Sequence, residues 1–495
     1  MADEPQMAGR QLFDVSEKQA RCLLVGLIVA STIGFSWLAF LKYAAFASQS
    51  IDTAIYSYAF NQARPGIFYP FLAGEGSLLG QHVGLLILFW MPIYWAVPSV
   101  PGLLLFQSLA ISLAAWPVYL LAFDKTRSRW TALVAAAGFL LYPPIVSQHV
   151  NQIHDDQFGL ALLLFAFYFF EAGNFKKFAV TLSLCLLAKE TVALPVACFS
   201  LYAVIRRRQS KWMAFPVVVS FAYVLFAWKV LAPMFGGTDS LVYLRMGYFG
   251  EYGDTPRGVL RYVLTHPAGT IEAMLAPDRL AYLFRLLLPV LLFLPLGSAA
   301  WLMALPGLMM NLFGSNSTLR DVRWHYSLFP AALLYASFVS AIPYWSRKLA
   351  RFFPGTDFAR VLCFAVLLGG LASYNFWLVP AQYRRDRAYQ ARREVIALIP
   401  RQASVLCSDN MLAHFSRHRS LQSLFGLRFY RRDPNEVFDY DYIVFDKNFA
   451  ITMGVQSLKQ LFELISQMPE YRLIFSRDGI LAYQRVGAPA RTLNW

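Results

Sequence analysis

Long apolar segments separated by short polar ones run through the first three quarters of this chain. Apolar runs recur from Cys22 to about Pro380 and are long enough to cross a bilayer, which takes roughly 20 helical residues. Basic residues gather in short loops between these runs, at 125–129, 176–177, 206–211 and 347–351. Because basic loops stay in the cytoplasm, this pattern predicts a polytopic membrane protein whose N-terminus is inside.

Following the chain from one basic loop to the next predicts about eleven transmembrane helices. The segment 178–205 is basic at both ends and carries Lys189-Glu190 near its middle, so we expect a hairpin of two short arms with this pair at its tip, in a cavity on the external side. The segment 82–97 contains Pro92 and is expected to lie in the outer interface. The predicted spans are 22–41, 103–123, 131–146, 158–171, 178–205 as two arms, 212–231, 281–296, 299–313, 327–345 and 361–379.

The composition becomes that of a soluble domain after Gln382. A helix is expected at 394–399, strands at 403–407 and 442–445, and a hairpin from 471–476 and 479–485. We therefore predict a transmembrane domain at 1–380, whose large first external loop spans 42–102. A small extracytoplasmic α/β domain follows at 381–495.

Overall composition supports this interpretation. The chain is 57% hydrophobic and only 15% charged. Its net charge of +15 comes largely from the basic loops, so membrane topology and lipid contact explain this charge without a nucleic-acid partner. The five cysteines have no paired spacing, which gives neither a disulfide framework nor a zinc site. Phosphate-binding P-loops, dinucleotide fingerprints and serine-hydrolase elbows do not occur in the sequence.

Ionisable residues that fall on the predicted external side are the candidates for chemistry. Gathered on one membrane face, they suggest a single aqueous site beside the bilayer. They are Asp52, His82, His154, Asp155, Asp156, Lys189, Glu190, Arg323 and His325.

Each candidate has a functional and a structural alternative. Asp52 is either the cap of a helix at 53–60 or a general base or orienting carboxylate. The run 153–157, Ile-His-Asp-Asp-Gln, is either a solvated turn or a loop that aims His154 and an acid at a shared ion. Lys189 either pairs with Glu190 or holds a phosphate oxygen.

The remaining candidates are two aromatic-rich segments. Arg323-Trp-His325-Tyr offers a guanidinium and aromatic rings to a phosphate or a sugar, or else forms an interfacial aromatic belt. His82 is either a ligand or a boundary residue of the interfacial helix.

The order of these features resembles the GT-C superfamily of integral-membrane glycosyltransferases. More closely, the chain is similar to a bacterial family of predicted membrane proteins of unknown function that is grouped with GT-C enzymes. The resemblance covers most of the chain and rests on Ile51-Asp-Thr-Ala-Ile-Tyr56, Gln81-His82, Pro92-Ile-Tyr94, Phe106-Gln107, His154-Asp, Lys189-Glu190, Leu305-Pro306, His325-Tyr326 and the stretch from Ser404-Val-Leu to Asp441-Tyr-Ile-Val-Phe-Asp446.

The resemblance implies a GT-C fold and transfer of a sugar from a polyprenyl-phosphate-type donor to a glycan, lipid or protein acceptor on the outer face of a bacterial inner membrane. It assigns the catalytic or acceptor-orienting carboxylate to Asp52. From the residues themselves we expect His154 and Asp155 to assist catalysis, and we expect donor or phosphate contacts from a wider set of residues: His82, Lys189, Glu190, Arg323 and His325. Asp155 and Asp156 occupy the place where some members bind a metal, but the first loop lacks paired acids, so a need for Mg or Mn is left open. The alternatives are a transporter of lipid-linked saccharide and a non-catalytic assembly partner.

Overall fold

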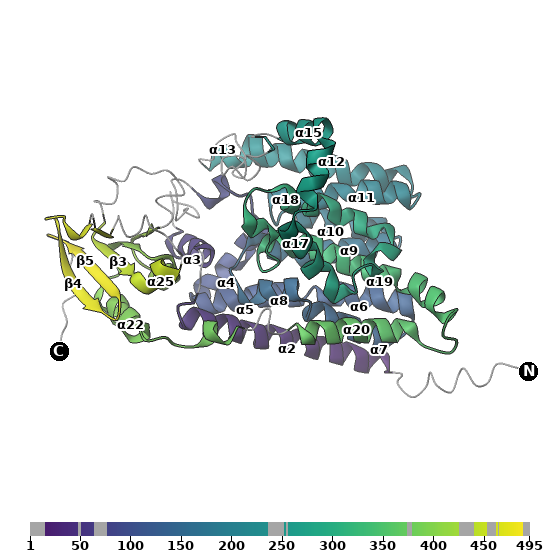
Figure 1. Cartoon of the computed structure of the whole chain (residues 1–495), viewed down its shortest axis with the longest axis horizontal. Helices are drawn as coiled ribbons and strands as arrows, with labels where there is room; N and C mark the ends of the chain where they lie inside the picture. The colour runs from purple at the N-terminus through teal and green to yellow at the C-terminus, as the bar shows by residue number, and fades with distance from the viewer. Residues whose placement is uncertain are drawn as a thin grey trace, which may run out of the picture.

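The computed structural model of the protein describes residues 15–47, 51–63, 77–235, 252–253, 256–373, 379–424, 440–452, 462–463 and 465–488. The predicted external loops at 42–102 and 233–279 fall partly outside these residues, as does the region 381–495. The described residues form a bundle of apolar helices and a small five-stranded sheet. Figure 1 shows this sheet at one end of the bundle, with helix α3 (Asp52–Gln62) beside it.

The bundle contains helices of two lengths. Four described helices are long and apolar enough to cross a membrane, and α7 and α8, which meet at 55°, would make a fifth if they form one span. The long ones are α2 (Glu17–Ala44), α5 with α6 (Val100–Ser112 and Ala115–Thr126), α12 with α13 (Ser210–Phe226 and Ala232–Met234) and α19 (Leu328–Ala350) with the turn before it. The other described helices of the bundle are α4 (Met91–Ala96), α7 (Arg129–Leu140), α8 (Pro143–Val150), α9 (Leu160–Glu171), α10 (Phe175–Leu186), α11 (Ala193–Ile205), α15 (Pro256–Thr265), α16 (Pro267–Met274), α17 (Pro277–Leu287), α18 (Leu305–Phe313) and α20 (Phe358–Ala372). A polytopic helical architecture is thus confirmed, while the total of about eleven spans stays a prediction.

The predicted hairpin in 178–205 is present. Helix α10 ends at Leu186 and α11 begins at Ala193, and Lys189 lies between them in an extended conformation before a 3₁₀ turn at Glu190–Val192. The carbonyl of Leu187 accepts hydrogen bonds from the main-chain N–H groups of Leu85 and Leu86, at 2.7 and 2.9 Å. The segment predicted as the first external loop is therefore fastened to the hairpin tip through the backbone.

Two predicted segments have different bounds from those expected. The expected span at 281–296 is broken, because α17 ends at Leu287 and 3₁₀ turns follow, with positive φ angles at Leu291 and Leu292. Pro289 and Pro295 lie within this stretch and lack the N–H that a continuous helix needs. In the segment 82–97 the helical part runs only from Leu86 to Ala96, and Pro92 lies in the first turn of α4, where proline is tolerated.

The C-terminal sheet has the strand order β2-β1-β3-β5-β4. The strands are β1 (Ser404–Cys407), β2 (Ser420–Ser423), β3 (Tyr442–Asp446), β4 (Tyr471–Arg477) and β5 (Ile480–Arg485), with α22 (Tyr389–Leu398), α23 (Asp409–Leu412) and α25 (Lys447–Thr452) around them. Strand β1 pairs in parallel with β2 and β3, and β4 and β5 form the predicted antiparallel hairpin. Asp478 and Gly479 both have positive φ in its turn, as a tight hairpin requires.

The sheet region is joined to α3 by hydrogen bonds to main-chain carbonyls. Asn61 donates to Ser416 at 3.3 Å, and Gln62 donates to His418 at 2.6 Å. At the far end of α9, Lys125 and Arg206 approach Glu171 at 2.5 and 3.7 Å, which brings two of the basic loops together there. The candidate residues lie at the other end of the bundle, next to the sheet.

Candidate active site

Helix α3 begins at Asp52, the lone acid at the start of the first loop. The residue before it, Ile51, makes no side-chain cap. Instead, Oε1 of Gln152 accepts hydrogen bonds from both the main-chain N–H and the hydroxyl of Thr53, each at 3.0 Å. Asp52 is therefore not the residue that caps this helix, and the start of the helix is fixed from a distant loop.

His154 lies opposite Asp52. Its Nε2 is 3.5 Å from Oδ2 of Asp52, and its main-chain N–H donates to Oε1 of Gln157 at 3.0 Å, which holds the loop in shape. Burial, and then the nearby Lys189 and His82, lower the pKa of His154 well below its usual value. The imidazole is therefore neutral near physiological pH and suited to orient the carboxylate or exchange a proton with it.

Asp155 is turned towards α3. Its Oδ1 accepts a hydrogen bond from the hydroxyl of Tyr56, and the same hydroxyl accepts from the main-chain N–H of Asp155. The backbone of Gly84 packs so closely on Asp155 that an added Cβ would overlap the carboxylate. Asp155 thus fixes the distance between α3 and the loop that carries His154.

His82 and Glu190 form a second pair. Nδ1 of His82 lies 3.0 Å from Oε1 of Glu190, and the main-chain N–H of Val83 donates to Oε2 at 2.9 Å. Both oxygens of Glu190 are therefore engaged by the first loop. The predicted phosphate contact by Glu190 has no support in this geometry, in which the acid positions His82 against the hairpin tip.

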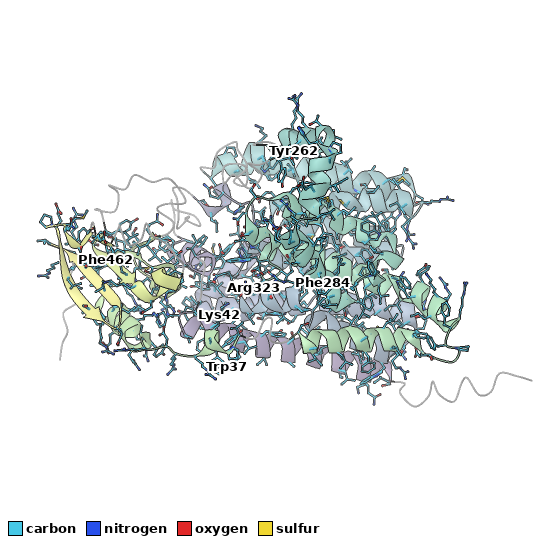
Figure 2. The ribbon with its side chains drawn as sticks, viewed as in Figure 1. Trp37, Lys42, Tyr262, Phe284, Arg323 and Phe462 are labelled. Atoms are coloured by element: carbon cyan, nitrogen blue, oxygen red, sulfur yellow. The ribbon has the colours of Figure 1, made fainter. Side chains whose placement is uncertain are left out.

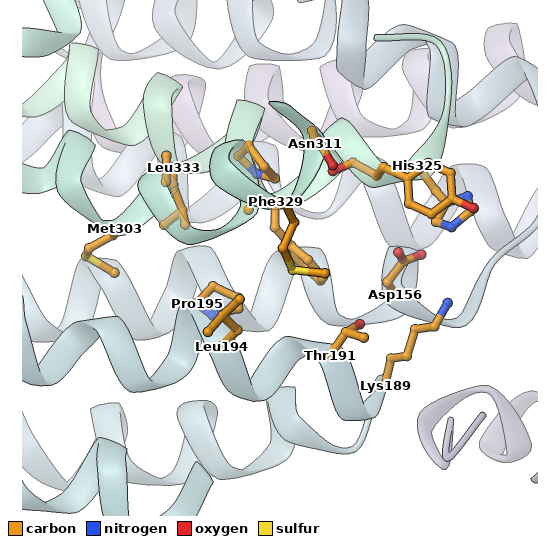
Figure 3. A pocket seen from close by; sticks show the side chains of 15 residues that line it. Asp156, Lys189, Thr191, Leu194, Pro195, Met303, Asn311, His325, Phe329 and Leu333 are labelled. Carbon is orange, nitrogen blue, oxygen red and sulfur yellow. The ribbon is translucent and has the colours of Figure 1, made fainter. Parts of the chain in front are cut away.

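A cleft opens beside these pairs and has two unlike halves. The space it encloses, up to its open side, is about 610 Å³. Figure 3 shows Asp156, Lys189 and His325 grouped at one end and Met303, Pro195 and Leu333 at the other. The remaining lining residues are Thr191, Leu194, Ala304, Gly307, Met310, Asn311, Tyr326, Phe329 and Pro330.

The polar end of the cleft adjoins the Asp52–His154 pair. The rings of His154 and His325 lie against each other, with their centroids 3.6 Å apart and their planes tilted by 32°. Asp156 and Lys189 are both almost completely buried. Burial raises the pKa of Asp156 to about 7, although Lys189 acts in the opposite direction. The carboxyl group of Asp156 consequently changes its charge near neutral pH.

Arg323 lies outside the cleft, contrary to the predicted grouping. Its guanidinium forms an ion pair with Asp321, with Nη2 2.6 Å from Oδ2, and about half of its side chain is exposed. A carboxylate two residues away therefore takes the contact that a donor phosphate was expected to make. Of the predicted aromatic segment, only His325 and Tyr326 line the cleft.

The residues present do not fit a metal site of several ligands. Asp155 is bonded to Tyr56, whereas Asp156 lines the cleft next to Lys189. Within the described part of the chain, no group of three or more His, Cys, Asp or Glu side chains is arranged to hold an ion. We therefore derive no step through a metal.

Several residues that build the site were not among the predicted ones. They are Tyr56, Gly84, Gln152, Gln157 and Asn311. The recurrence of glutamine at 148, 152 and 157, within a short turn between apolar runs, is the one sequence signal that could have indicated them. Nε2 of Gln107 and of Gln157 donate to main-chain carbonyls of this turn, which shows its structural use.

Comparison with known proteins supports the architecture. Among solved structures, ArnT from Cupriavidus metallidurans in the apo state matches with a TM-score of 0.51 and 11% identity, covering 91% of this chain and 97% of that one. ArnT from the same organism bound to undecaprenyl phosphate gives a TM-score of 0.48 and 12% identity, covering 93% and 98%. A search of curated proteins gave no match.

At this identity the apo structure establishes the fold alone. The fold is of the GT-C type, as the resemblance implied. The sequence of residues 42–482 matches the family described as "Predicted membrane protein (DUF2079)". This match covers most of the protein, which therefore belongs to the DUF2079 family of predicted membrane proteins.

Proposed function

We propose that this protein is a membrane glycosyltransferase that moves a sugar from a polyprenyl-phosphate-type lipid to an acceptor on the extracytoplasmic face. The observation that carries the proposal is the Asp52–His154 pair beside a cleft with a cationic end and an apolar wall. The GT-C-type fold is consistent with it. An apolar chain next to a phosphate is the ligand that such a two-part cleft suits.

The donor side of the reaction is assigned to the cleft. Lys189, almost completely buried at its polar end, would hold the donor phosphate as a point charge. The polyprenyl chain would lie along the apolar wall formed by residues such as Leu194, Phe329 and Leu333. Both the lipid-linked donor and ordinary membrane lipids would reach this cleft from the bilayer.

Asp52 is assigned to the acceptor. The acceptor hydroxyl oxygen forms its bond to the anomeric carbon as the bond from that carbon to the donor phosphate breaks. The hydroxyl proton passes to Asp52, and the phosphate leaves with the electron pair, its charge stabilised by Lys189. His154, being neutral, orients the carboxylate of Asp52 from 3.5 Å without competing for the phosphate.

The surroundings of the site agree with this assignment. Placing the basic loops in the cytoplasm puts the N-terminus inside and the candidate site at the outer face of a bacterial inner membrane. With domains at 1–380 and 381–495, the C-terminal domain is proposed to help select the acceptor. Its main-chain carbonyls at Ser416 and His418 hold the end of α3, so it also supports the helix of Asp52.

The test is a transfer assay with the purified protein and a panel of polyprenyl-phosphate-linked sugars, comparing Asp52→Asn with Asp278→Asn. Asp278 is also an acid in the first turn of a helix, but it is half-exposed and paired with Arg320. We expect Asp52→Asn to lower the transfer rate at least about a hundredfold, in the range for a lost general base, and Asp278→Asn to leave it unchanged. Full activity of a folded Asp52→Asn protein would contradict the assignment.

A second readout separates transfer from transport. Wild-type protein in liposomes is supplied with labelled lipid-linked sugar, and both the labelled product and the leaflet of the label are followed. A new glycosidic bond supports the proposal. Movement of label between leaflets without any new bond would instead indicate a transporter.

A further inference from the structure

Lys42, in the last turn of α2, is a buried cation that, within the described residues, makes its polar contact with a neutral group. Lys42 is only 8% exposed, and its Nζ donates to Oδ1 of Asn151 at 2.7 Å. Within the part of the chain that the structure describes, no carboxylate pairs with it. Because an ammonium offers three donors and is costly to bury without a counter-charge, this environment indicates an absent anion.

The end of helix α2 does not account for the position of Lys42. The carbonyls of the last turn already accept main-chain hydrogen bonds: Leu41 from Ala45, Tyr43 from Phe46 and Lys42 from Ala47. The side chain of Lys42 is therefore not needed as a cap. It points instead to the start of α3 and the end of α8.

A second positive charge lies close to this cation. Arg323 interacts electrostatically with Lys42, and its main-chain carbonyl accepts from Nδ2 of Asn151 at 2.8 Å, so Asn151 links the two cations. Figure 2 shows the side chains of Lys42 and Arg323 in the same region of the molecule. Arg323 is itself paired with Asp321, both oxygens of which accept from its guanidinium.

Lys42 also lines a hollow that is separate from the cleft. The hollow is small and is bordered by Thr53, Asn151 and Gln152. No residue lines both cavities. Thr53 lies in the first turn of α3, so the hollow lies next to the start of this helix.

We propose that Lys42, with Asn151 and the nearby Arg323, forms a second anion-binding site that takes the phosphate or carboxylate group of the acceptor. That the anion belongs to the acceptor rests on the proposed function, whereas the existence of the anion site does not. An anion held there places the rest of the acceptor beside the first turn of α3.

The test measures anion binding without catalysis, in a protein whose donor site has been disabled. Full-length Lys189→Met protein in phosphatidylcholine nanodiscs is titrated with inorganic phosphate against sodium chloride at equal ionic strength, and the thermal midpoint is followed. A second arm replaces part of the lipid with phosphatidylglycerol. The variants Lys42→Met and Lys42→Arg are added to this background, with Lys211→Met, in an exposed segment, as the control.

We expect phosphate or phosphatidylglycerol to raise the midpoint of the Lys189→Met protein. Lys42→Met should weaken this response at least tenfold, while Lys42→Arg and Lys211→Met should keep it. A response to phosphate identifies a soluble acceptor group, and a response to phosphatidylglycerol alone identifies a lipid headgroup. If Lys189→Met alone removes every response, or if Lys42→Met leaves the response intact, the second site is refuted and the proposed donor site is unaffected.

Discussion

Protonation of Asp156 should control the affinity of the cleft for a donor phosphate. Asp156 and Lys189 lie together at the polar end of the cleft, and burial raises the pKa of the acid to about 7. Below this pKa the carboxyl group is neutral and the charge of Lys189 is available to an anion. Above it the carboxylate neutralises Lys189 and repels the phosphate, so donor binding should weaken as the pH rises through neutrality.

The size of this effect follows from linkage. If the donor binds only when Asp156 is neutral, Kd rises about tenfold for each pH unit above the pKa. Between about pH 5.5 and about pH 8.5 the predicted loss of affinity is then about 30-fold, and residual binding to the ionised form makes it smaller. Asp156→Asn removes the titrating group, so its Kd should stay near the low-pH value of the wild type throughout.

The assay is equilibrium binding of a short-chain prenyl phosphodiester of a sugar to protein in nanodiscs across this pH range. A phosphodiester keeps one negative charge at every pH used, so the ligand contributes no slope. His154 stays neutral across the range, since its pKa is lowered well below the usual value. A flat wild-type profile, or a slope that persists in Asp156→Asn, would refute the link between this carboxyl group and the donor.

Two further substitutions test how the site is held together. Gly84→Ala should lower the thermal midpoint and slow transfer, because the added Cβ overlaps the carboxylate of Asp155 and overpacking costs about 1–3 kcal/mol. Gly26→Ala is the control, since open space surrounds Gly26. Equal thermal midpoints for the two variants would contradict this prediction. Gln152→Met should lower the thermal midpoint, because it leaves the buried N–H of Thr53 without its acceptor, which costs about 1–3 kcal/mol of stability. Gln152→Glu keeps an acceptor oxygen and should recover most of this loss. A thermal midpoint of Gln152→Met equal to that of the wild type would show that this contact does not stabilise α3.

The helical bundle and the hairpin tip were predictable because their signals are local. Apolar runs, basic loops and the charged pair at Lys189 can each be recognised within about 30 residues of sequence, the reach of one span and its flanks. The β4–β5 hairpin was predicted for the same reason, since its tight turn follows from the residues at 477–479. The expected span at 281–296 is not one continuous helix, because its two prolines interrupt the helical hydrogen bonds.

The pairings within the site were not predictable because they join distant segments. Tyr56 meets Asp155 and Thr53 meets Gln152 across about a hundred positions, and no local pattern in one segment specifies its partner in the other. Arg323 shows the converse case. Its partner Asp321 lies two residues away, so the sequence held the information that the guanidinium has a nearby carboxylate.

The single acid at the start of α3 has a physical consequence for the proposed reaction. Two adjacent carboxylates at this position would repel each other and raise the pKa of one unless a cation held both. The partner of Asp52 is instead a neutral imidazole at 3.5 Å, and Asp155 is committed to Tyr56. In the proposed reaction Asp52 accepts the acceptor's proton as a carboxylate, and the neutral imidazole adds no charge beside it. The cations proposed to bind anions, Lys189 and Lys42, line two different cavities, so the proposed site separates proton transfer from anion binding in space.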